Sequence, residues 1–518
     1  MLTSEKSITV NKIGGANMSK LDEVLNLVRV LQEQNEAPVL VVSAFEGVTN
    51  KLIAALDELD RKDYKEEDIE NAFRPIMLMV EEKIKEFIKS SRHARQALAH
   101  VKREMDICVT VLMTHKRVTN MLAPDAKTYQ TRDKIIAFGE RSVVGILEAF
   151  LQASGIKAKS VNDVEYRGNG KRESKSELHR GIQRGIAEAI DPYKDEISEQ
   201  VLIIGGHVKG VLRGMVTEIG RSYTDTTAVD VTVALEKLLG LSVDSTVAWK
   251  DVDGVLSSDP KRLDPAVNKE IVHHDVSLSE GMELAGANST LMQVDALGLA
   301  LEEGISLSLK NITKPHEEGT TFHVEETTTV FPFKIVMANR REDTISCKIP
   351  GMAVGSGFAA ALTKAFADND ISINDIMTSS TTIDFTVNLP PDESDIKELR
   401  GRIRKTIAKI RNIEVNGEVH KCDSKWHQSN NANVVIIGDE LRNATGILSV
   451  IAGVLSAEGI GVEMMTQTKE QRKISFYVNH KDANRAVQSL HRVFIDKDGE
   501  FGAKVKKGMD ATIEKFLK

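Results

Sequence analysis

The first half of the chain alternates short apolar runs with longer segments in which apolar residues recur every three or four positions. Residues 38–45 form an unbroken apolar run, and similar strand patterns recur at residues 199–206 and 245–256. Residues 18–34 and 48–59 have helical spacing. Unbroken apolar strands separated by amphipathic helices are typical of a parallel sheet that is covered on both faces. The pattern therefore predicts an α/β fold with an open, mostly parallel sheet sandwiched by helices.

A charged stretch interrupts this alternation between residues 61 and 134. Its apolar residues keep a helical period, while charged residues fill the positions between them. We expect an inserted helical subdomain whose charged faces are solvated. The polar, glycine-containing stretch at residues 165–177 predicts a surface loop.

The pattern changes past about residue 330, where an internal repeat begins. Residues 343–389 read as strand, helix, strand and strand, and residues 432–480 repeat that order. A further helical segment follows each unit, so both fit a βαββαβ module. We therefore expect one large domain over residues 1–325 and two small modules at residues 335–425 and 430–518. Such a pair suits regulation, and the alternative is that it only forms a dimer interface.

Composition narrows the classes of function. A chain of 518 residues with 41% hydrophobic and 28% charged residues is typical of a soluble protein with several domains. The net charge of −8 argues against a nucleic-acid or anionic-membrane partner. No apolar run approaches the roughly 20 residues that cross a bilayer. The scattered Cys108, Cys347 and Cys422 argue against a disulfide framework or zinc site and favour a reducing cytoplasm.

Two predicted strands end in residues that suit an anionic ligand. Lys12 is followed by Gly14 and Gly15, which let the backbone approach a phosphate while the lysine ammonium neutralises it. Ser43 and Thr49 follow the next strand, and ligands of parallel sheets bind beyond the carboxyl ends of strands. An ordinary tight turn and helix capping by Thr49 are the structural alternatives.

The stretch GRSYTDTTAVDVTVAL, residues 220–235, places Arg221, Thr224 and Asp225 before an apolar helical run. The first N–H groups of a helix lack partners and attract anions, which suggests a ligand pocket. Thr224 or Asp225 could instead simply cap the helix. Glu140 lies in another helical pattern, where it is exposed by default or faces a cleft and holds a substrate ammonium group.

Residues 247–265 are rich in carboxylates and turn residues. Asp251, Asp253 and Asp259 could bind a cation and Lys261 could face a phosphate, although Asp-Gly and Asp-Pro steps are also ordinary turn chemistry. The spacing does not match an EF-hand loop, and no His/Cys ligand set is apparent. No metal site formed by the protein is therefore assigned.

Six sequence blocks occur in an order that resembles the aspartokinase family. They are KIGG, VVSAFEGVTNKL, FGERS, GRSYTDTTA, WKDVDGVLSSDP and LKNITKPHEEGT, and the C-terminal repeat is similar to that family's pair of ACT domains. The resemblance covers essentially the whole chain apart from the helical insertion. It implies an amino-acid-kinase fold and phosphorylation of the L-aspartate side-chain carboxylate by ATP with Mg²⁺, giving 4-phospho-L-aspartate. A kinase for another carboxylate and a catalytically impaired regulatory homologue are the alternatives.

The resemblance also implies roles for individual residues. Lys12 would contact the transferred phosphoryl group, and Asp225 would orient Lys12 or a substrate ammonium group. The implied aspartate-binding residues are Ser43, Thr49, Glu140, Arg221 and Thr224. The implied nucleotide-binding residues are Lys12, Gly14, Gly15, Lys250, Asp251, Leu256 and Lys261. The implied effector-binding residues of the ACT pair are Met352, Val354, Gly355, Asn374 and Asp375.

The resemblance implies partners as well, and the chain departs from the family pattern at three positions. We expect lysine, threonine or methionine as the effector and a homodimer or higher oligomer formed through the ACT domains. The biosynthetic branch stays open between these amino acids and ectoine. Ala16 lacks the hydroxyl of the family block, and Ser222 and Tyr223 stand where the family has two glycines. These changes put the backbone contacts of that loop in doubt.

Overall fold

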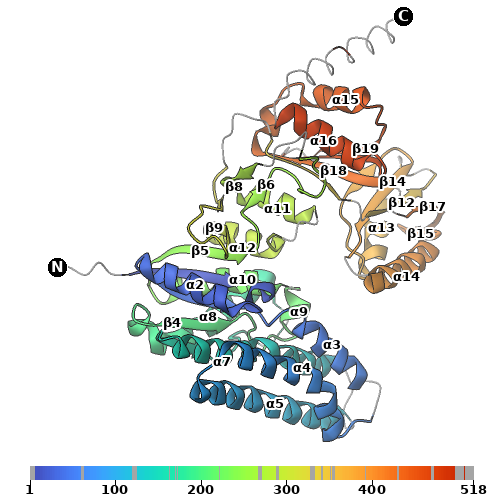
Figure 1. Ribbon diagram of the computed structural model, residues 1–518. Coiled ribbons are helices and arrows are strands. Elements are labelled where there is room, and N and C mark those ends of the chain that lie inside the picture. The colour runs from blue at the N-terminus through green and yellow to red at the C-terminus, as the bar shows by residue number, and fades with distance from the viewer. Residues whose placement is uncertain are drawn as a thin grey trace, which may run out of the picture. The chain divides into compact units, whose positions relative to one another are not determined.

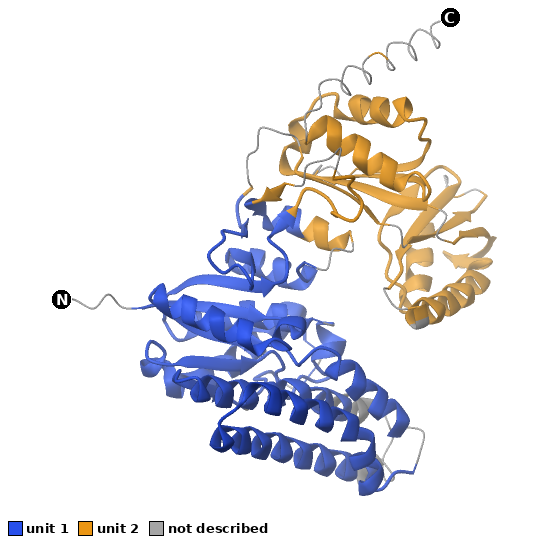
Figure 2. Ribbon diagram, in the orientation of Figure 1, with its two compact units in different colours: residues 1–255, 274–281, 291–325 blue, residues 256–273, 282–290, 326–518 orange. Residues whose placement is uncertain are grey.

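The fold is taken from a computed structural model. It describes residues 6–59, 63–119, 125–162, 164–169, 171, 173–220, 222–265, 271–287, 291–326, 333–339, 342–350, 352, 356–390, 393–428, 431–467, 472–495 and 507, without the side chains of 117–119, 125–130 and 394. The chain divides into two compact units (Figure 2). The first unit comprises residues 1–255, 274–281 and 291–325, and the second comprises residues 256–273, 282–290 and 326–518.

The first unit is built on an eight-stranded sheet with the order β3-β4-β2-β1-β5-β9-β10-β8. Its strands are β1 (Ser7–Ile13), β2 (Glu36–Val42), β3 (Ala158–Val161), β4 (Val201–Gly205), β5 (Val243–Lys250), β8 (Asp275–Ser277), β9 (Leu307–Asn311) and β10 (Thr320–His323). The strands from β3 to β9 in this order pair parallel, and β10 pairs antiparallel with β9. The predicted mostly parallel sheet is confirmed.

Helices cover both faces of this sheet because alternate strand residues point to opposite sides. Leu40 and Val42 belong to an apolar core with the helices of one face, and Val39 and Val41 belong to a core with the helices of the other. The first core contains residues of α2 (Leu21–Glu33), α3 (Val48–Leu59) and α7 (Phe138–Ala153). The second contains residues of α8 (Lys175–Ile190) and α10 (Tyr223–Val233). The remaining short elements of this unit are α1 (Gly15–Met18), α9 (Met215–Glu218), α12 (Val294–Glu303), η1 (Asp191–Glu196) and the π-helical η2 (Ala234–Leu238).

The charged stretch between residues 61 and 134 is mostly helical in its described part. It contains α4 (Glu66–Phe87), α5 (Ser91–Thr119) and most of α6 (Asp125–Ile136). In Figure 1, α4 and α5 are long helices that lie beside α7, and apolar residues of all three share one core. The insertion therefore extends the helical layer on one face of the sheet.

The second unit holds two small α/β modules. The first module pairs a sheet of order β13-β14-β12-β17 with two helices, and the second pairs a sheet of order β11-β18-β20-β19 with two helices. The elements of the first module are β12 (Glu342–Lys348), α13 (Phe358–Ala367), β13 (Ile376–Thr378), β14 (Thr382–Asn388), α14 (Glu393–Ile410), the hairpin of β15 (Asn412–Val415) and β16 (Glu418–Lys421), and β17 (Asp423–His427). Those of the second are β11 (Ile335–Asn339), β18 (Asn431–Ile437), η4 (Asp439–Asn443), α15 (Ile447–Ala457), β19 (Val462–Gln467), β20 (Lys473–Asn479) and α16 (Ala483–Phe494).

The position of β11 differs from the module boundary that we expected at residue 335. β11 pairs antiparallel with β18, so it belongs to the sheet of the second module although it precedes the first along the chain. Val336 and Ala338 explain this pairing, because both are buried in the apolar core of the second module. The first module is therefore inserted between two adjacent strands of the second.

Three elements lie where the chain passes between the two units. They are β6 (Val255–Leu256), β7 (Val272–His273), which pairs with β6, and α11 (Leu278–Gly286). In the described part of the chain, no helix combines the length and the apolar character that a bilayer span requires.

Candidate functional site

Three charged side chains meet where β1, β5 and α10 come together. The Lys12 Nζ atom lies 2.5 Å from Asp225 Oδ1, and the Lys250 Nζ atom lies 4.0 Å from Asp225 Oδ2. Lys12 is near the end of β1, Lys250 is the last residue of β5, and these strands are parallel neighbours in the sheet. The sheet therefore brings two ammonium groups, 238 positions apart in sequence, to one carboxylate.

The charges of this cluster determine its protonation. Burial alone would raise the pKa of Asp225, but the charges of Lys12 and Lys250 outweigh burial and hold that pKa below its ordinary value. Burial, followed by the charge of Lys12, lowers the pKa of Lys250. Two lysines share one ionised carboxylate, so the cluster has a surplus of positive charge that suits a polyanion.

A chain of hydrogen bonds leads from α10 to α7. Ser43 Oγ donates to Thr224 Oγ1 at 3.0 Å, and Thr224 Oγ1 donates to Glu140 Oε1 at 3.3 Å. Glu140 is only 5% exposed and lines a cavity, so the default expectation of an exposed glutamate is wrong, while its binding of an ammonium group stays a prediction. Burial raises the pKa of Glu140 to about 7, although the charge of His207 and hydrogen bonds from Tyr223 and Thr224 lower it.

A cavity of about 260 Å³, which we call the strand-end cavity, lies between these groups. It is lined by Gly15, Ala16, Ser43, Ala44, Phe45, Glu46, Gly47, Thr49, Asn50, Ile53, Glu140, Val216, Ser222, Tyr223 and Thr224. A buried glutamate on one wall and hydroxyl groups on another suit a small ligand that carries an ammonium group. The cavity therefore unites five predicted site residues: Gly15, Ser43, Thr49, Glu140 and Thr224.

Two glycines of this region are required by close packing. A Cβ atom on Gly15 would lie 2.7 Å from the carbonyl oxygen of Ala44, and one on Gly206 would lie 2.5 Å from Thr224 Oγ1. Side chains at these positions would push the walls of the cavity apart. Gly14 precedes α1 in extended backbone, and a Cβ atom there would make only an ordinary contact with Lys12 Nζ.

The start of α10 shows that neither Thr224 nor Asp225 is the N-cap of this helix. The N-cap of α10 is Ser222, and the side chains of Thr224 and Asp225 engage Glu140 and Lys12. Ser222 has φ = 66°, a left-handed conformation that glycine adopts without strain. The family pattern with glycine at this position therefore has a conformational reason. Arg221 lies outside the described residues.

The remaining predicted nucleotide residues are spread over both units. Asp251 is exposed directly after Lys250 in the first unit, whereas Leu256 and Lys261 belong to the second. Of the other carboxylates in this stretch, Asp253 accepts from Lys314 Nζ at 2.6 Å and from Asn311 at 2.6 Å. Throughout the described residues, no group of three or more His, Cys, Asp or Glu side chains is placed to hold a metal ion.

One buried pair near Glu140 was not among the residues predicted from the sequence. His207 Nε2 lies 2.8 Å from Asp133 Oδ2, and the His207 ring packs edge-on against the Tyr223 ring with centroids 6.0 Å apart. Asp133 comes from α6, so the helical insertion reaches the periphery of the site. A histidine two positions after Gly205, the last residue of β4, was the one available signal.

The predicted effector residues that are described lie in the first module. Asp375 accepts a hydrogen bond from the Tyr477 hydroxyl at 2.7 Å, and Asn374 donates to Glu342 Oε1 at 3.3 Å. Met352 packs against the apolar core of this module. Val354 and Gly355 lie outside the described residues. Asn374 and Asp375 thus face polar groups of the second unit's interior, and their role as effector ligands stays a prediction.

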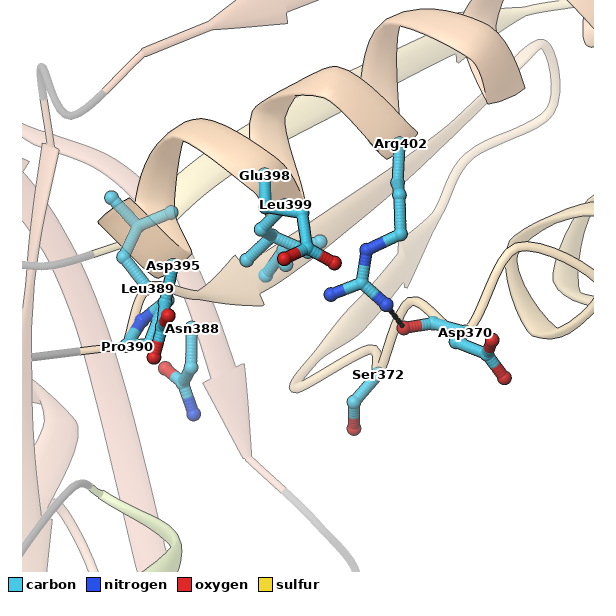
Figure 3. A pocket seen from close by; sticks show the side chains of 10 residues that line it. Asp370, Ser372, Asn388, Leu389, Pro390, Asp395, Glu398, Leu399 and Arg402 are labelled. Atoms are coloured by element: carbon cyan, nitrogen blue, oxygen red, sulfur yellow. Dashed lines mark hydrogen bonds between the residues drawn. The ribbon is translucent and has the colours of Figure 1, made fainter. Parts of the chain in front are cut away.

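A second hollow, of about 380 Å³, lies on the first module (Figure 3). In this view Arg402 extends toward Asp370, whose carbonyl oxygen accepts from Arg402 Nη1 at 2.8 Å. Asp395 and Glu398 of α14 also line the hollow. None of the described effector candidates lines it, so it has no assigned role.

Comparisons with known proteins cover nearly the whole chain. Residues 7–300 match the model of the amino acid kinase family, and residues 434–494 match a model of an ACT domain. Aspartokinase 1, chloroplastic, of Arabidopsis thaliana is 27% identical over 95% of this chain and 81% of the relative. The aspartokinase of Candida albicans is 22% identical over 95% of this chain and 91% of the relative. Aspartokinase III of E. coli, solved with lysine and aspartate, aligns with a TM-score of 0.70 at 19% identity over 94% of this chain and 99% of that chain.

Proposed function

Because the chain belongs to the amino acid kinase family, we propose that it transfers the γ-phosphoryl group of ATP to the side-chain carboxylate of L-aspartate. The product is 4-phospho-L-aspartate. The observation that carries the proposal is the start of α10, where Asp225 holds Lys12 and the neighbouring Thr224 reaches Glu140. Lys12, which would contact the phosphate, and Glu140, which would bind the substrate ammonium group, are therefore partners of two consecutive residues of α10. The curated relatives named aspartokinase support the choice of aspartate.

The acceptor needs positioning and charge screening more than a base. An aspartate side chain has an ordinary pKa of about 3.9 and is ionised near neutral pH, so no proton has to leave it before it attacks. The obstacle is the repulsion between this carboxylate and the ATP phosphates. Lys12 and Lys250 would reduce that repulsion, and Asp225 would hold the Lys12 ammonium group in place.

The phosphate side of the site would receive ATP as its magnesium complex. Magnesium commonly keeps phosphate oxygens and water among its ligands, so we place it on the ATP phosphates and assign it no ligand from the protein. The cation would spread the charge that develops on the transferred phosphoryl group. Gly14 and Gly15 would keep the backbone beneath the phosphates free of side chains.

The strand-end cavity would hold the amino acid. Glu140 would bind the aspartate ammonium group, because a carboxylate that is buried away from water is strongly stabilised by a cationic partner. Ser43, Thr49 and Thr224 would supply hydroxyl groups that orient the substrate. Arg221 is proposed to pair with the α-carboxylate of the substrate, as the resemblance implies.

Regulation through the C-terminal modules is part of the same proposal. Asp375 of the first module is linked to Tyr477 of the second, so a ligand that engages Asp375 would change the contact between the modules. We propose an amino-acid effector at Met352, Asn374 and Asp375 and a homodimer or higher oligomer formed through these modules. Inhibition by lysine, threonine or methionine tests this, and activity that is unchanged by all three would mean that the modules serve assembly alone.

We also propose a cytoplasmic location. The three buried cysteines are free thiols, which suits a reducing compartment.

Coupled ADP release with purified protein, ATP, MgCl₂ and a panel of amino acids tests the reaction. L-aspartate should give the highest kcat/KM, and L-glutamate and N-acetyl-L-glutamate should be far poorer acceptors. A higher kcat/KM for another carboxylate would move the protein to a different member of the family. A folded protein that releases no ADP with any of them would be a regulatory homologue.

A further inference from the structure

The pair of His207 and Asp133 is fixed from several directions. Their side chains are 2% and 6% exposed, and His207 Nε2 lies 2.8 Å from Asp133 Oδ2. The other carboxylate oxygen of Asp133 accepts the backbone N–H of Met215 at 2.8 Å. Gly214 adopts φ = 85° directly over Asp133, where a Cβ atom would lie 2.5 Å from the carboxylate. The carboxylate therefore has one orientation, and it determines the orientation of the imidazole.

His207 is linked to Glu140 in two direct ways and once through Tyr223. Its backbone N–H donates a hydrogen bond to Glu140, and its charge lowers the pKa of Glu140 against the effect of burial. Its ring packs against Tyr223, whose hydroxyl also hydrogen-bonds to Glu140. His207 does not line the strand-end cavity, so it acts on a substrate there only through Glu140 and Tyr223.

Other charged groups near Glu140 have partners of their own or line a separate hollow. Arg141, the next residue in α7, pairs through Nε with Glu104 Oε2 at 2.5 Å. Lys209 lines a separate small hollow, to which Glu140 and His207 also contribute, and it does not line the strand-end cavity. The carboxylate of Asp133 is shared between His207 and the start of α9. Among the groups that lower the pKa of Glu140, His207 has the largest effect.

Resting on the proposed function, we propose that His207, fixed by Asp133, is a positioning residue that favours the ionised form of Glu140 and holds its carboxylate toward the ammonium group of aspartate. The helical insertion then has a part in substrate binding, because α6 supplies Asp133. The competing account is that the pair only stabilises the fold. The first unit contains a natural comparison for that account: His179 Nδ1 lies 3.0 Å from Asp230 Oδ2, equally buried but on the face of α10 that packs against α8.

The test compares His207→Gln with His179→Gln in the full-length protein. Glutamine at either position can still donate a hydrogen bond to the neighbouring carboxylate but carries no positive charge. Binding of L-aspartate is measured by calorimetry between pH 6 and 9, without ATP, and steady-state KM and kcat are measured over the same range. The calorimetry does not depend on turnover, so a protein that binds aspartate without phosphorylating it would refute the proposed reaction and still test this inference.

We expect His207→Gln to weaken aspartate binding about tenfold at pH 7, with the KM for ATP unchanged and kcat within about threefold of the wild type. Without the electrostatic interaction with His207, Glu140 should protonate at higher pH, so the acidic limb of the affinity profile should move upward by about half a pH unit or more. His179→Gln should leave that limb in place. His207→Phe, which keeps the ring against Tyr223, should shift the limb in the same direction. An unshifted limb in both His207 variants, or an equal shift in His179→Gln, would overturn the proposal.

Discussion

Two buried glutamates, one in each compact unit, share a raised pKa but have different surroundings. Burial raises the pKa of Glu140 to about 7, and burial followed by the charge of Asp375 raises the pKa of Glu342 to about 7. Glu140 faces the strand-end cavity, next to hydroxyl groups. Glu342 lines neither that cavity nor the hollow of Figure 3. A raised pKa therefore reports burial, and the cavity beside the carboxylate is what distinguishes a binding site.

The neighbours of Glu342 explain its different role. Side-chain amides of Asn339, Asn374 and Asn433 surround its Oε1 atom at 3.2, 3.3 and 3.4 Å. Asn339 and Asn433 belong to the second module, whereas Glu342 and Asn374 belong to the first. Glu342 is thus a junction between the two modules, with amide donors in place of a ligand.

The largest expected effect comes from removing the ammonium group of Lys12, which belongs to the same unit as Glu140. Lys12→Met should lower kcat by about 100-fold or more, because the transferred phosphoryl group loses a charge contact that is strongest in the transition state. Lys473→Met is the matched control, since Lys473 Nζ lies 3.2 Å from Glu283 and 3.9 Å from Asp375 near Glu342. Its basal kcat should stay within about twofold of the wild type. Comparable losses in the two variants, measured by ADP release, would remove Lys12 from its role.

The next effect separates the two glutamates directly. Glu140→Gln should raise the KM for aspartate about 50-fold, because a buried charge-assisted hydrogen bond to the substrate ammonium group is lost. Glu342→Gln should leave that KM unchanged. If steady-state kinetics showed an unchanged KM in Glu140→Gln, the ammonium group would have to bind elsewhere.

The third effect concerns stability and pH. The pKa of Glu342 is higher in the folded protein, at about 7, than its ordinary 4.5, so the folded state binds more protons between these values and loses stability as pH rises through them. Between pH 5 and pH 7 the wild type should lose about 2 kcal/mol of unfolding free energy relative to Glu342→Gln, whose amide does not titrate. Denaturant-induced unfolding, followed through the transition of the second unit, measures this difference in unfolding free energy. A gap that is the same at both pH values would show that Glu342 titrates normally.

The smallest effect concerns the strained residue at the edge of the strand-end cavity. Ser222→Gly should stabilise the protein by about 0.5–1 kcal/mol, because glycine adopts φ = 66° without the strain that a Cβ atom causes there. Ser222→Ala retains the Cβ atom and should not be stabilising. Thermal unfolding of both variants checks this, and equal midpoints would mean that the left-handed backbone at Ser222 carries no strain.

Local pattern predicted the sheet and part of the site for a physical reason. The apolar run that contains Leu40 and Val41 has partners on both faces, so it identifies a buried parallel strand. Lys12 lies near the end of β1 and Ser43 directly follows β2, which is the parallel neighbour of β1, so their proximity follows from strand direction. These inferences need only the period of the sequence and the geometry of a parallel sheet.

Other features depend on contacts that no local pattern encodes. Asp133 and His207 are 74 positions apart and belong to a helix and a loop, so nothing in either segment indicates the other. β11 pairs with β18 across the entire first module, and its apolar residues would suit either sheet. The burial of Glu140 was ambiguous for the same reason, because the cavity wall is completed by Tyr223 and Thr224 from α10.

Trapping the product tests the central claim most directly. Wild-type protein is incubated with ATP, MgCl₂, L-aspartate and hydroxylamine, which converts an acyl phosphate into a stable hydroxamate. We predict aspartate β-hydroxamate in amounts that equal the ADP released, with at least a 100-fold lower rate in Lys12→Met. Folded wild-type protein that forms no aspartate hydroxamate would contradict the account. So would a Lys12→Met variant that forms the hydroxamate at the wild-type rate.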